Sequence, residues 1–198
     1  PFTEALDLVK TLPDSAARSE QELFLQISLA APLQAARGYS SPEVGRVYAR
    51  ARELCDHVGE TPQMFPVLHL LAVYYGTRGE HRASLEIAER HLELASGSED
   101  ATVRALAHWM VGWGLTFLGR LKEAQTHLER VIEFYDPEDH DTLAFRHGGQ
   151  DPGVSCLALV PWVLWLRGYP DQAGTRSRED LSLAEELDQP FGLGIALG

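Results

Sequence analysis

Apolar residues recur along the chain with the spacing of amphipathic helices. They follow the i, i+3, i+4, i+7 rule after Gly38 and again after Gly119, whereas no comparable stretch alternates with a period of two. We therefore expect essentially no β-sheet. The pattern predicts about ten helices, over residues 2–12, 15–37, 42–58, 62–78, 80–96, 100–118, 120–135, 153–167, 170–187 and from 190 onward.

Proline and its preceding residue support these boundaries. Ser41-Pro42, Thr61-Pro62 and Asp151-Pro152 each place a capping side chain before a proline. The first N–H groups of a helix have no partner within the helix. Proline at the first position has no N–H to satisfy, and the side chain before it accepts a hydrogen bond from one of the N–H groups that follow. These pairs therefore predict helix starts.

One phrase recurs: an apolar helix, a glycine, four mostly polar residues and a small residue that opens a second apolar helix. It is centred on Gly79, Gly119 and Gly168, with a looser copy at Gly38, at intervals of 41, 40 and 49 residues. Such a glycine suits the left-handed turn that ends a helix. Stacked two-helix hairpins bury their apolar faces in one continuous core.

The sequence thus predicts an all-α fold, an α-α superhelix or solenoid of about four hairpins with a half-repeat at each end. We expect it to form a single domain over 1–198, with repeats near 15–58, 62–96, 100–135 and 153–187 and a loop insertion at 136–152.

The repeat resembles the tetratricopeptide repeat. The residues that carry the resemblance are Val111-Gly112, Leu115, Gly119, Ala124 and Leu128 in one hairpin, and Leu71-Ala72, Tyr75, Gly79, Ser84 and Ala88 in another. The copies around Gly38 and Gly168 depart from the signature at Gln34 and Pro161, and the second helices lose small residues at His91 and Asp180. The period of about forty also exceeds the usual ~34 residues, which indicates an extended variant.

Longer phrases narrow the resemblance. The segments 42–55, 151–154, 164–173 and 189–197 look like the C-terminal tetratricopeptide region of large bacterial signalling proteins. In those proteins the repeats follow an ATPase module coupled to a class III adenylate/guanylate cyclase, a Ser/Thr kinase or a LuxR-type DNA-binding domain. The resemblance implies a sensor or protein-interaction arm. Because the chain starts at Pro1 rather than Met, we expect it to be a fragment of a larger protein.

The chain carries 17 basic and 29 acidic residues, a formal net charge of −12. This balance argues against sequence-independent nucleic-acid binding and against an anionic membrane surface, and it favours a basic or neutral partner. Cys55 and Cys156 are too far apart in sequence for a disulfide framework and fit a reducing, cytoplasmic compartment. No signal peptide and no run long enough to span a membrane is present.

The tetratricopeptide resemblance implies that the first helix of each hairpin lines a concave groove. The groove-facing positions then include all four tryptophans; they are His69, Val73, Trp109, Trp113, Phe117, Trp162 and Trp165. Aromatic side chains are common anchors in recognition grooves. The alternative is that they pack one hairpin on the next, as aromatic stripes at helical spacing usually do.

The 136–152 insertion offers a second candidate site, with His140, His147 and Asp151 among several acidic residues. Such a cluster could bind a divalent metal or transfer protons. No HExxH-like spacing fixes two ligands on one helix, so a solvated loop is the simpler interpretation. We predict no metal, no cofactor and no catalytic residue.

Three functional hypotheses follow. The favoured one is a non-enzymatic scaffold that binds a protein, a peptide or another domain of the same chain. The second is a small-molecule effector receptor that uses the tryptophan-lined groove and the 136–152 loop. The third is a hydrolase or metal site in that loop. The scaffold predicts an open groove, and the receptor predicts an enclosed pocket. The hydrolase or metal site predicts a cluster of ligating side chains.

Overall fold

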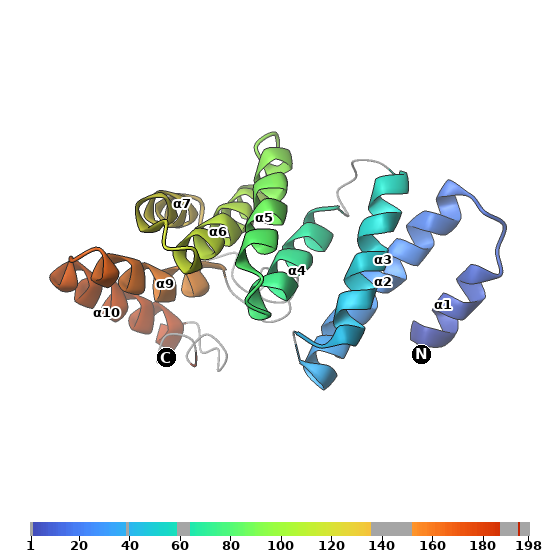
Figure 1. Ribbon diagram of the computed structural model, residues 1–198, viewed down its shortest axis with the longest axis horizontal. Helices are drawn as coiled ribbons and strands as arrows, with labels where there is room; N and C mark the ends of the chain where they lie inside the picture. The colour runs from blue at the N-terminus through green and yellow to red at the C-terminus, as the bar shows by residue number, and fades with distance from the viewer. Residues whose placement is uncertain (1, 39, 59–63, 136–151, 187–193, 195–198) are drawn as a thin grey trace. The chain divides into compact units, whose positions relative to one another are not determined.

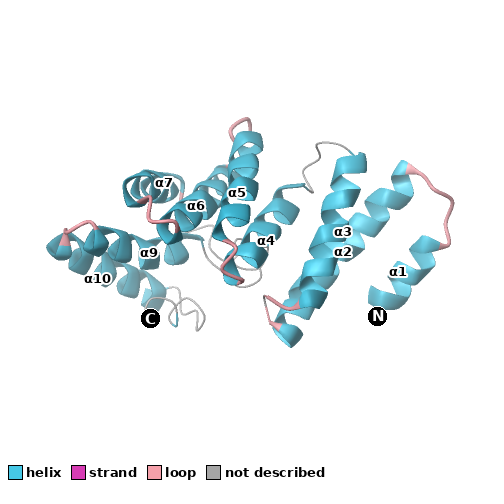
Figure 2. Cartoon of the chain, viewed as in Figure 1, coloured by secondary structure: helices cyan, strands magenta, loops and turns pink. Residues whose placement is uncertain are grey.

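The computed structural model describes residues 2–38, 40–58, 64–135, 152–186 and 194. Every regular element in these ranges is an α-helix, and none of them forms a strand (Figure 2). The predicted all-α helical-repeat fold is confirmed.

The helices follow one another as antiparallel hairpins joined by short turns (Figure 1). They are α1 (Phe2–Lys10), α2 (Ala16–Arg37), α3 (Pro42–Val58), α4 (Met64–Thr77), α5 (His81–Ala95), α6 (Ala101–Phe117), α7 (Leu121–Phe134), α9 (Pro152–Leu166) and α10 (Pro170–Glu186). Their bounds lie within two residues of the predicted ones. The helix expected from residue 190 onward lies outside the described residues, and the repeat boundaries and the single domain stay predictions.

The chain divides into two compact units, residues 1–87 and 88–198. In unit 1, α1 packs on α2, α2 on α3 and α3 on α4. In unit 2, α6 packs on α7 and α9 on α10, and α9 also contacts both α6 and α7. No helix in the described ranges is both long and apolar enough to cross a membrane.

Three hairpin turns share one backbone pattern. Gly79, Gly119 and Gly168 have positive φ angles of 78°, 76° and 87°. At each turn the residue after the glycine donates its N–H to a carbonyl five residues earlier: Glu80 to Tyr75 at 2.9 Å, Arg120 to Leu115 at 2.9 Å and Tyr169 to Leu164 at 2.9 Å. This is the Schellman arrangement, which satisfies the last carbonyls of a helix and requires a left-handed residue.

The turn at Gly38 is built differently. Gly38 also has a positive φ, 85°, but its own N–H donates to the Gln34 carbonyl at 2.8 Å, and Ser41 then donates to the Gly38 carbonyl at 3.3 Å. The other three turn glycines donate instead to a carbonyl three residues earlier, of Gly76, Thr116 and Trp165.

Small residues let the two helices of a hairpin approach closely. In α5, Ser84 is buried and its hydroxyl donates to the Ala72 carbonyl of α4 at 2.8 Å. In the next hairpin, a Cβ placed on Gly112 would lie 2.7 Å from Leu128 Cδ2 and 3.4 Å from the Ala124 carbonyl oxygen. The residues five positions after each of these two turn glycines are thus the points where the helices touch.

One buried charge departs from this small-residue pattern. Asp180 on α10 is 1% exposed, and its Oδ1 has no hydrogen-bond partner among the described residues. Burial raises the pKa of Asp180 to about 7. In the sequence, Asp180 stands where the second helix of the repeat usually has a small side chain.

Replacing Gly112 with Ala tests the close approach of α6 and α7. In an ordinary helix interior this change stabilises, by about 0.5–1 kcal/mol. Here the added methyl overlaps Leu128, so we expect Gly112→Ala to lower the free energy of unfolding by about 1–3 kcal/mol in chemical denaturation. Gly97→Ala is the control, because its Cβ would meet only the Leu94 carbonyl at 4.0 Å. A Gly112→Ala protein as stable as the parent would contradict the packing described.

Asp180→Asn tests the buried carboxyl. Since the pKa of Asp180 in the folded chain is about 7 and its ordinary value is 3.8, the folded state holds a proton that the unfolded state has lost between these values. Stability contributed by this group therefore falls as pH rises from about 4 through 7. Asp180→Asn should raise Tm more at pH 8 than at pH 5, whereas Glu185→Gln, an exposed change on the same helix, should alter Tm equally little at both.

Candidate functional site

An aromatic ladder runs along one side of α6. Trp109, Trp113 and Phe117 are four residues apart, so successive helical turns carry them one above the other. The rings of Trp109 and Trp113 are stacked, with centroids 5.8 Å apart and planes 7° apart. Trp113 then meets Phe117 edge to face, with centroids 6.0 Å apart and planes 85° apart. The three rings hold one another in a defined order.

Exposure rises along this ladder toward the turn. Trp109 is buried, Trp113 is half-buried and Phe117 is 47% exposed. The helix that carries them is fixed at its start, where the Asp100 carboxylate accepts hydrogen bonds from the N–H groups of Thr102 and Val103. The buried Trp109 thus holds Trp113 by stacking, and Trp113 in turn contacts the exposed Phe117.

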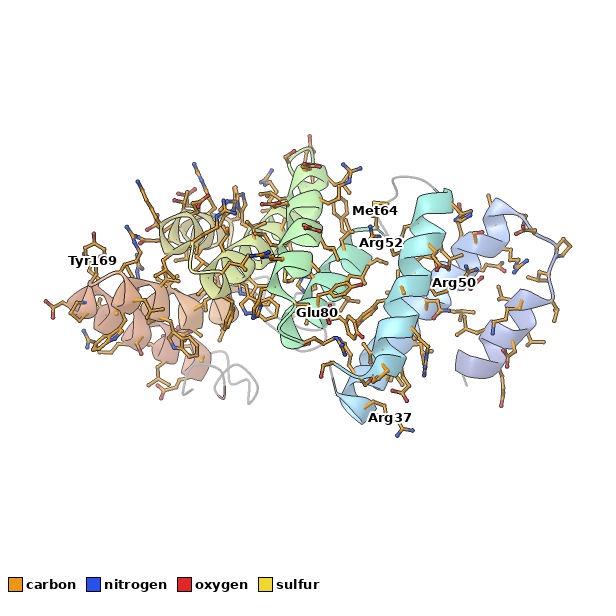
Figure 3. The ribbon with its side chains drawn as sticks, viewed as in Figure 1. Arg37, Arg50, Arg52, Met64, Glu80 and Tyr169 are labelled. Atoms are coloured by element: carbon orange, nitrogen blue, oxygen red, sulfur yellow. The ribbon has the colours of Figure 1, made fainter. Side chains whose placement is uncertain are left out.

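A second aromatic surface lies on α9 and α10. Trp162, Trp165 and Leu166 are 52%, 67% and 64% exposed. They surround a hollow of about 450 Å³ whose lining is almost entirely apolar. Its other walls are Pro161, Pro170, Ala173, Gly174 and Ser177. Tyr169, at the turn between the two helices, is also exposed (Figure 3).

The two surfaces occupy matching positions in their hairpins. Trp113 and Trp162 each lie six residues before a turn glycine, and Phe117 and Leu166 each lie two residues before one. Positions with the same offset from the turn glycine are structurally equivalent in these two hairpins. Leu166 is not among the residues that the sequence predicts for the groove, but its offset from Gly168 matches that of Phe117 from Gly119.

The predicted α4 positions differ from these. His69 is 2% exposed and Val73 is also buried. Neither side chain is available to a partner in this conformation, and their place in a binding groove stays a prediction.

The loop candidates His140, His147 and Asp151 lie outside the described residues. Within the described ranges, no group of three or more His, Cys, Asp or Glu side chains is placed to hold a metal ion. In the part of the chain that the structure describes, the candidate site therefore consists of the aromatic ladder on α6 and the second aromatic surface on α9 and α10.

The buried sulfur of unit 2 is not placed for nucleophilic chemistry. Cys156 is fully buried, and its thiol donates a hydrogen bond to the Leu128 carbonyl at 3.2 Å. Burial strongly raises the pKa of this thiol. A reactive cysteine requires the opposite, an accessible thiol with a lowered pKa. Cys156 links α9 to α7 instead.

In unit 1, a partly buried ion pair joins α2 to α3. Glu22 on α2 is buried and accepts two hydrogen bonds from Arg50 on α3, at 2.7 and 3.0 Å (Figure 3). Arg50 also pairs with Glu53 at 2.9 Å. The Arg50 guanidinium lowers the pKa of Glu22, which therefore stays ionised. A carboxylate held by two parallel hydrogen bonds fixes the α2–α3 pairing and is not free to bind a ligand.

Comparison with known proteins supports the fold. No family model matches the chain, and no curated protein matches it in sequence. Among solved structures, the apo form of RapI, a helical-repeat protein, superposes with a TM-score of 0.74 at 16% sequence identity. The match covers 94% of this chain and 63% of RapI, so the chain spans somewhat less than two thirds of that protein. At this level of identity the likeness is one of fold, and the chain is an all-α helical-repeat protein similar in architecture to RapI.

Proposed function

We propose that this chain is a non-enzymatic scaffold that binds a protein or peptide segment through the aromatic surfaces of unit 2. The observation that carries the proposal is the set of large apolar side chains around the α9–α10 hollow, each more than half exposed. Contiguous exposed apolar surface is unusual on an isolated soluble domain and commonly marks an interaction site.

The energy available at this surface is adequate for recognition. A tryptophan side chain buries roughly 150–250 Å² when covered, and apolar burial contributes about 25 cal/mol per Å². Two half-exposed tryptophans and a leucine can therefore contribute several kcal/mol before the cost of association is subtracted. Their indole N–H groups can donate to the partner's carbonyls, which gives direction as well as affinity.

The net charge restricts the partner. With a formal charge of −12, the chain attracts basic or neutral segments and repels acidic ones, including nucleic acids. The hollow itself is nearly free of polar groups. We infer a partner segment with apolar anchors flanked by Lys or Arg, supplied by another protein or by another domain of the same polypeptide.

The sequence resemblance supports a more specific role. The segments 42–55, 151–154 and 164–173 look like the repeat region of bacterial signal-transduction ATPases, so we propose that the chain serves as a regulatory or sensor arm of such a protein. Two buried cysteines, Cys55 and Cys156, support a reducing cytoplasmic location. The similarity of fold to RapI is compatible with this role.

A small-molecule receptor is the weaker alternative. Such a site encloses most of its ligand and places a few polar groups against it. The hollow beside Trp162 and Trp165 has walls that solvent reaches, and among its lining side chains only Ser177 offers a hydroxyl. An extended partner fits this surface better than an enclosed effector.

The proposal predicts that Trp162→Ala and Trp165→Ala weaken binding without unfolding the chain. The probe is a peptide selected from a random displayed library on the immobilised 198-residue protein, with affinity measured by fluorescence anisotropy. Because both side chains are exposed, each change should cost roughly tenfold or more in affinity while helical circular dichroism is unchanged. Trp113→Ala should also reduce binding, since Trp113 supports Phe117.

Phe24→Ala is the matched control. Phe24 is an equally exposed aromatic side chain on α2 in unit 1, so its loss should leave peptide affinity unchanged. If selected peptides bind the tryptophan variants as tightly as the parent, or if the library yields no binder, the proposed surface is wrong.

A further inference from the structure

Two histidines from neighbouring helices meet at the side of the α6–α7 hairpin. His108 on α6 and His127 on α7 are 19 positions apart in sequence, and their Nδ1 atoms lie 3.1 Å apart. Their ring centroids are 5.1 Å apart, with planes inclined by 43°. Both rings are half-buried, so solvent reaches the pair from one side. Neither residue belongs to the aromatic surfaces described above.

The simplest account of this distance is a hydrogen bond in which one neutral ring donates to the other. The same spacing also fits two nitrogen ligands of one metal ion. With metal–nitrogen distances of about 2.0–2.1 Å, nitrogens 3.1 Å apart subtend about 100° at the metal. That angle lies between the ~90° of square-planar and octahedral ions and the ~109° of tetrahedral ones.

From this geometry we propose that His108 and His127 together bind one divalent transition-metal ion, of the zinc, nickel or copper class, across the α6–α7 hairpin. Imidazole nitrogen is a preferred ligand of these ions and a poor one for calcium or magnesium. The remaining coordination positions take water, because the described residues supply no third ligand of a metal cluster.

The charges around the pair favour a cation. His108 faces Arg130 and Glu133 of α7. His127 faces Glu123 of its own helix, Arg120 at the N-cap of that helix, and Glu89 of α5. Arg120 pairs with Glu123, and Arg130 pairs with Glu133 at 2.6 Å, so these four charges offset one another and Glu89 is the additional carboxylate. The Arg104 guanidinium lies over the Phe134 ring, 4.8 Å from its centroid, and donates to the Ser98 carbonyl.

Both Nδ1 atoms can bind one ion when each neutral ring carries its proton on Nε2. In the hydrogen-bonded pair one ring carries its proton on Nδ1, and that ring changes tautomer when the ion binds. On the inner side, the Phe134 ring lies 5.9 Å from the His108 ring and limits that ring's alternative positions.

The experiment titrates Zn²⁺ into the 198-residue chain at neutral pH by isothermal calorimetry, and records Cu²⁺ electron paramagnetic resonance to count bound nitrogens. We expect one ion per chain at this site and hyperfine structure from two nitrogens. His108→Gln and His127→Gln should each weaken that site roughly tenfold or more, because one nitrogen ligand remains. His57→Gln should have no effect, since His57 is exposed and lies against the Glu53 carbonyl of its own helix at 2.7 Å.

A second measurement needs no substitution. Zn²⁺ should protect His108 and His127 from chemical modification by diethyl pyrocarbonate, with each histidine followed by peptide mass spectrometry. Ions held elsewhere, for example by His140 and His147, protect other peptides and are distinguished by position. Absence of protection at the pair, or equal Zn²⁺ affinity in the His108→Gln, His127→Gln and His57→Gln proteins, would overturn the proposal and leave a plain hydrogen bond.

Discussion

The left-handed glycine turn is the constraint on which the hairpins depend. A helix that ends in this way places the N–H of the following residue on a carbonyl five positions back, and the chain then leaves antiparallel to the helix it came from. Any residue with a Cβ is strained at φ near +80°. The same three-dimensional turn therefore recurs at Gly79, Gly119 and Gly168.

Two consequences follow within each hairpin. Five residues after the turn, a small residue meets the preceding helix, as in the contact of Ser84 with the Ala72 carbonyl, and this sets how closely the helices approach. Six and two residues before the turn, the first helix carries side chains away from that contact, which is where Trp113 and Phe117, and Trp162 and Leu166, lie. The side chains that pack against the second helix and those that solvent reaches thus lie on different sides of the first helix.

The hairpin also brings together side chains that have no relation in sequence. Because α6 and α7 are held close by Gly112 and Leu128, His108 and His127 come within hydrogen-bonding distance on the flank of that contact. Similarly, the α2–α3 approach lets Arg50 hold the buried Glu22. These polar contacts form because small apolar residues hold the helices close together. Hydrogen bonds are directional, so they specify the relative position of the two helices more narrowly than apolar packing does.

The sequence by itself determined the helices, their ends and the turns, because these depend on local periodicity, capping residues and the conformational freedom of single glycines. It also marked Gly38 as the loosest turn and Asp180 as a break in the small-residue pattern. Only the tertiary structure decided which predicted groove residues solvent reaches: Trp162 and Trp165 are exposed, whereas Trp109 and His69 are buried. All four are large and apolar or aromatic at helical spacing, so periodicity cannot distinguish them. Exposure depends on which neighbouring side chains cover each position, and pairs such as His108 and His127 depend on a crossing between helices that no local pattern encodes.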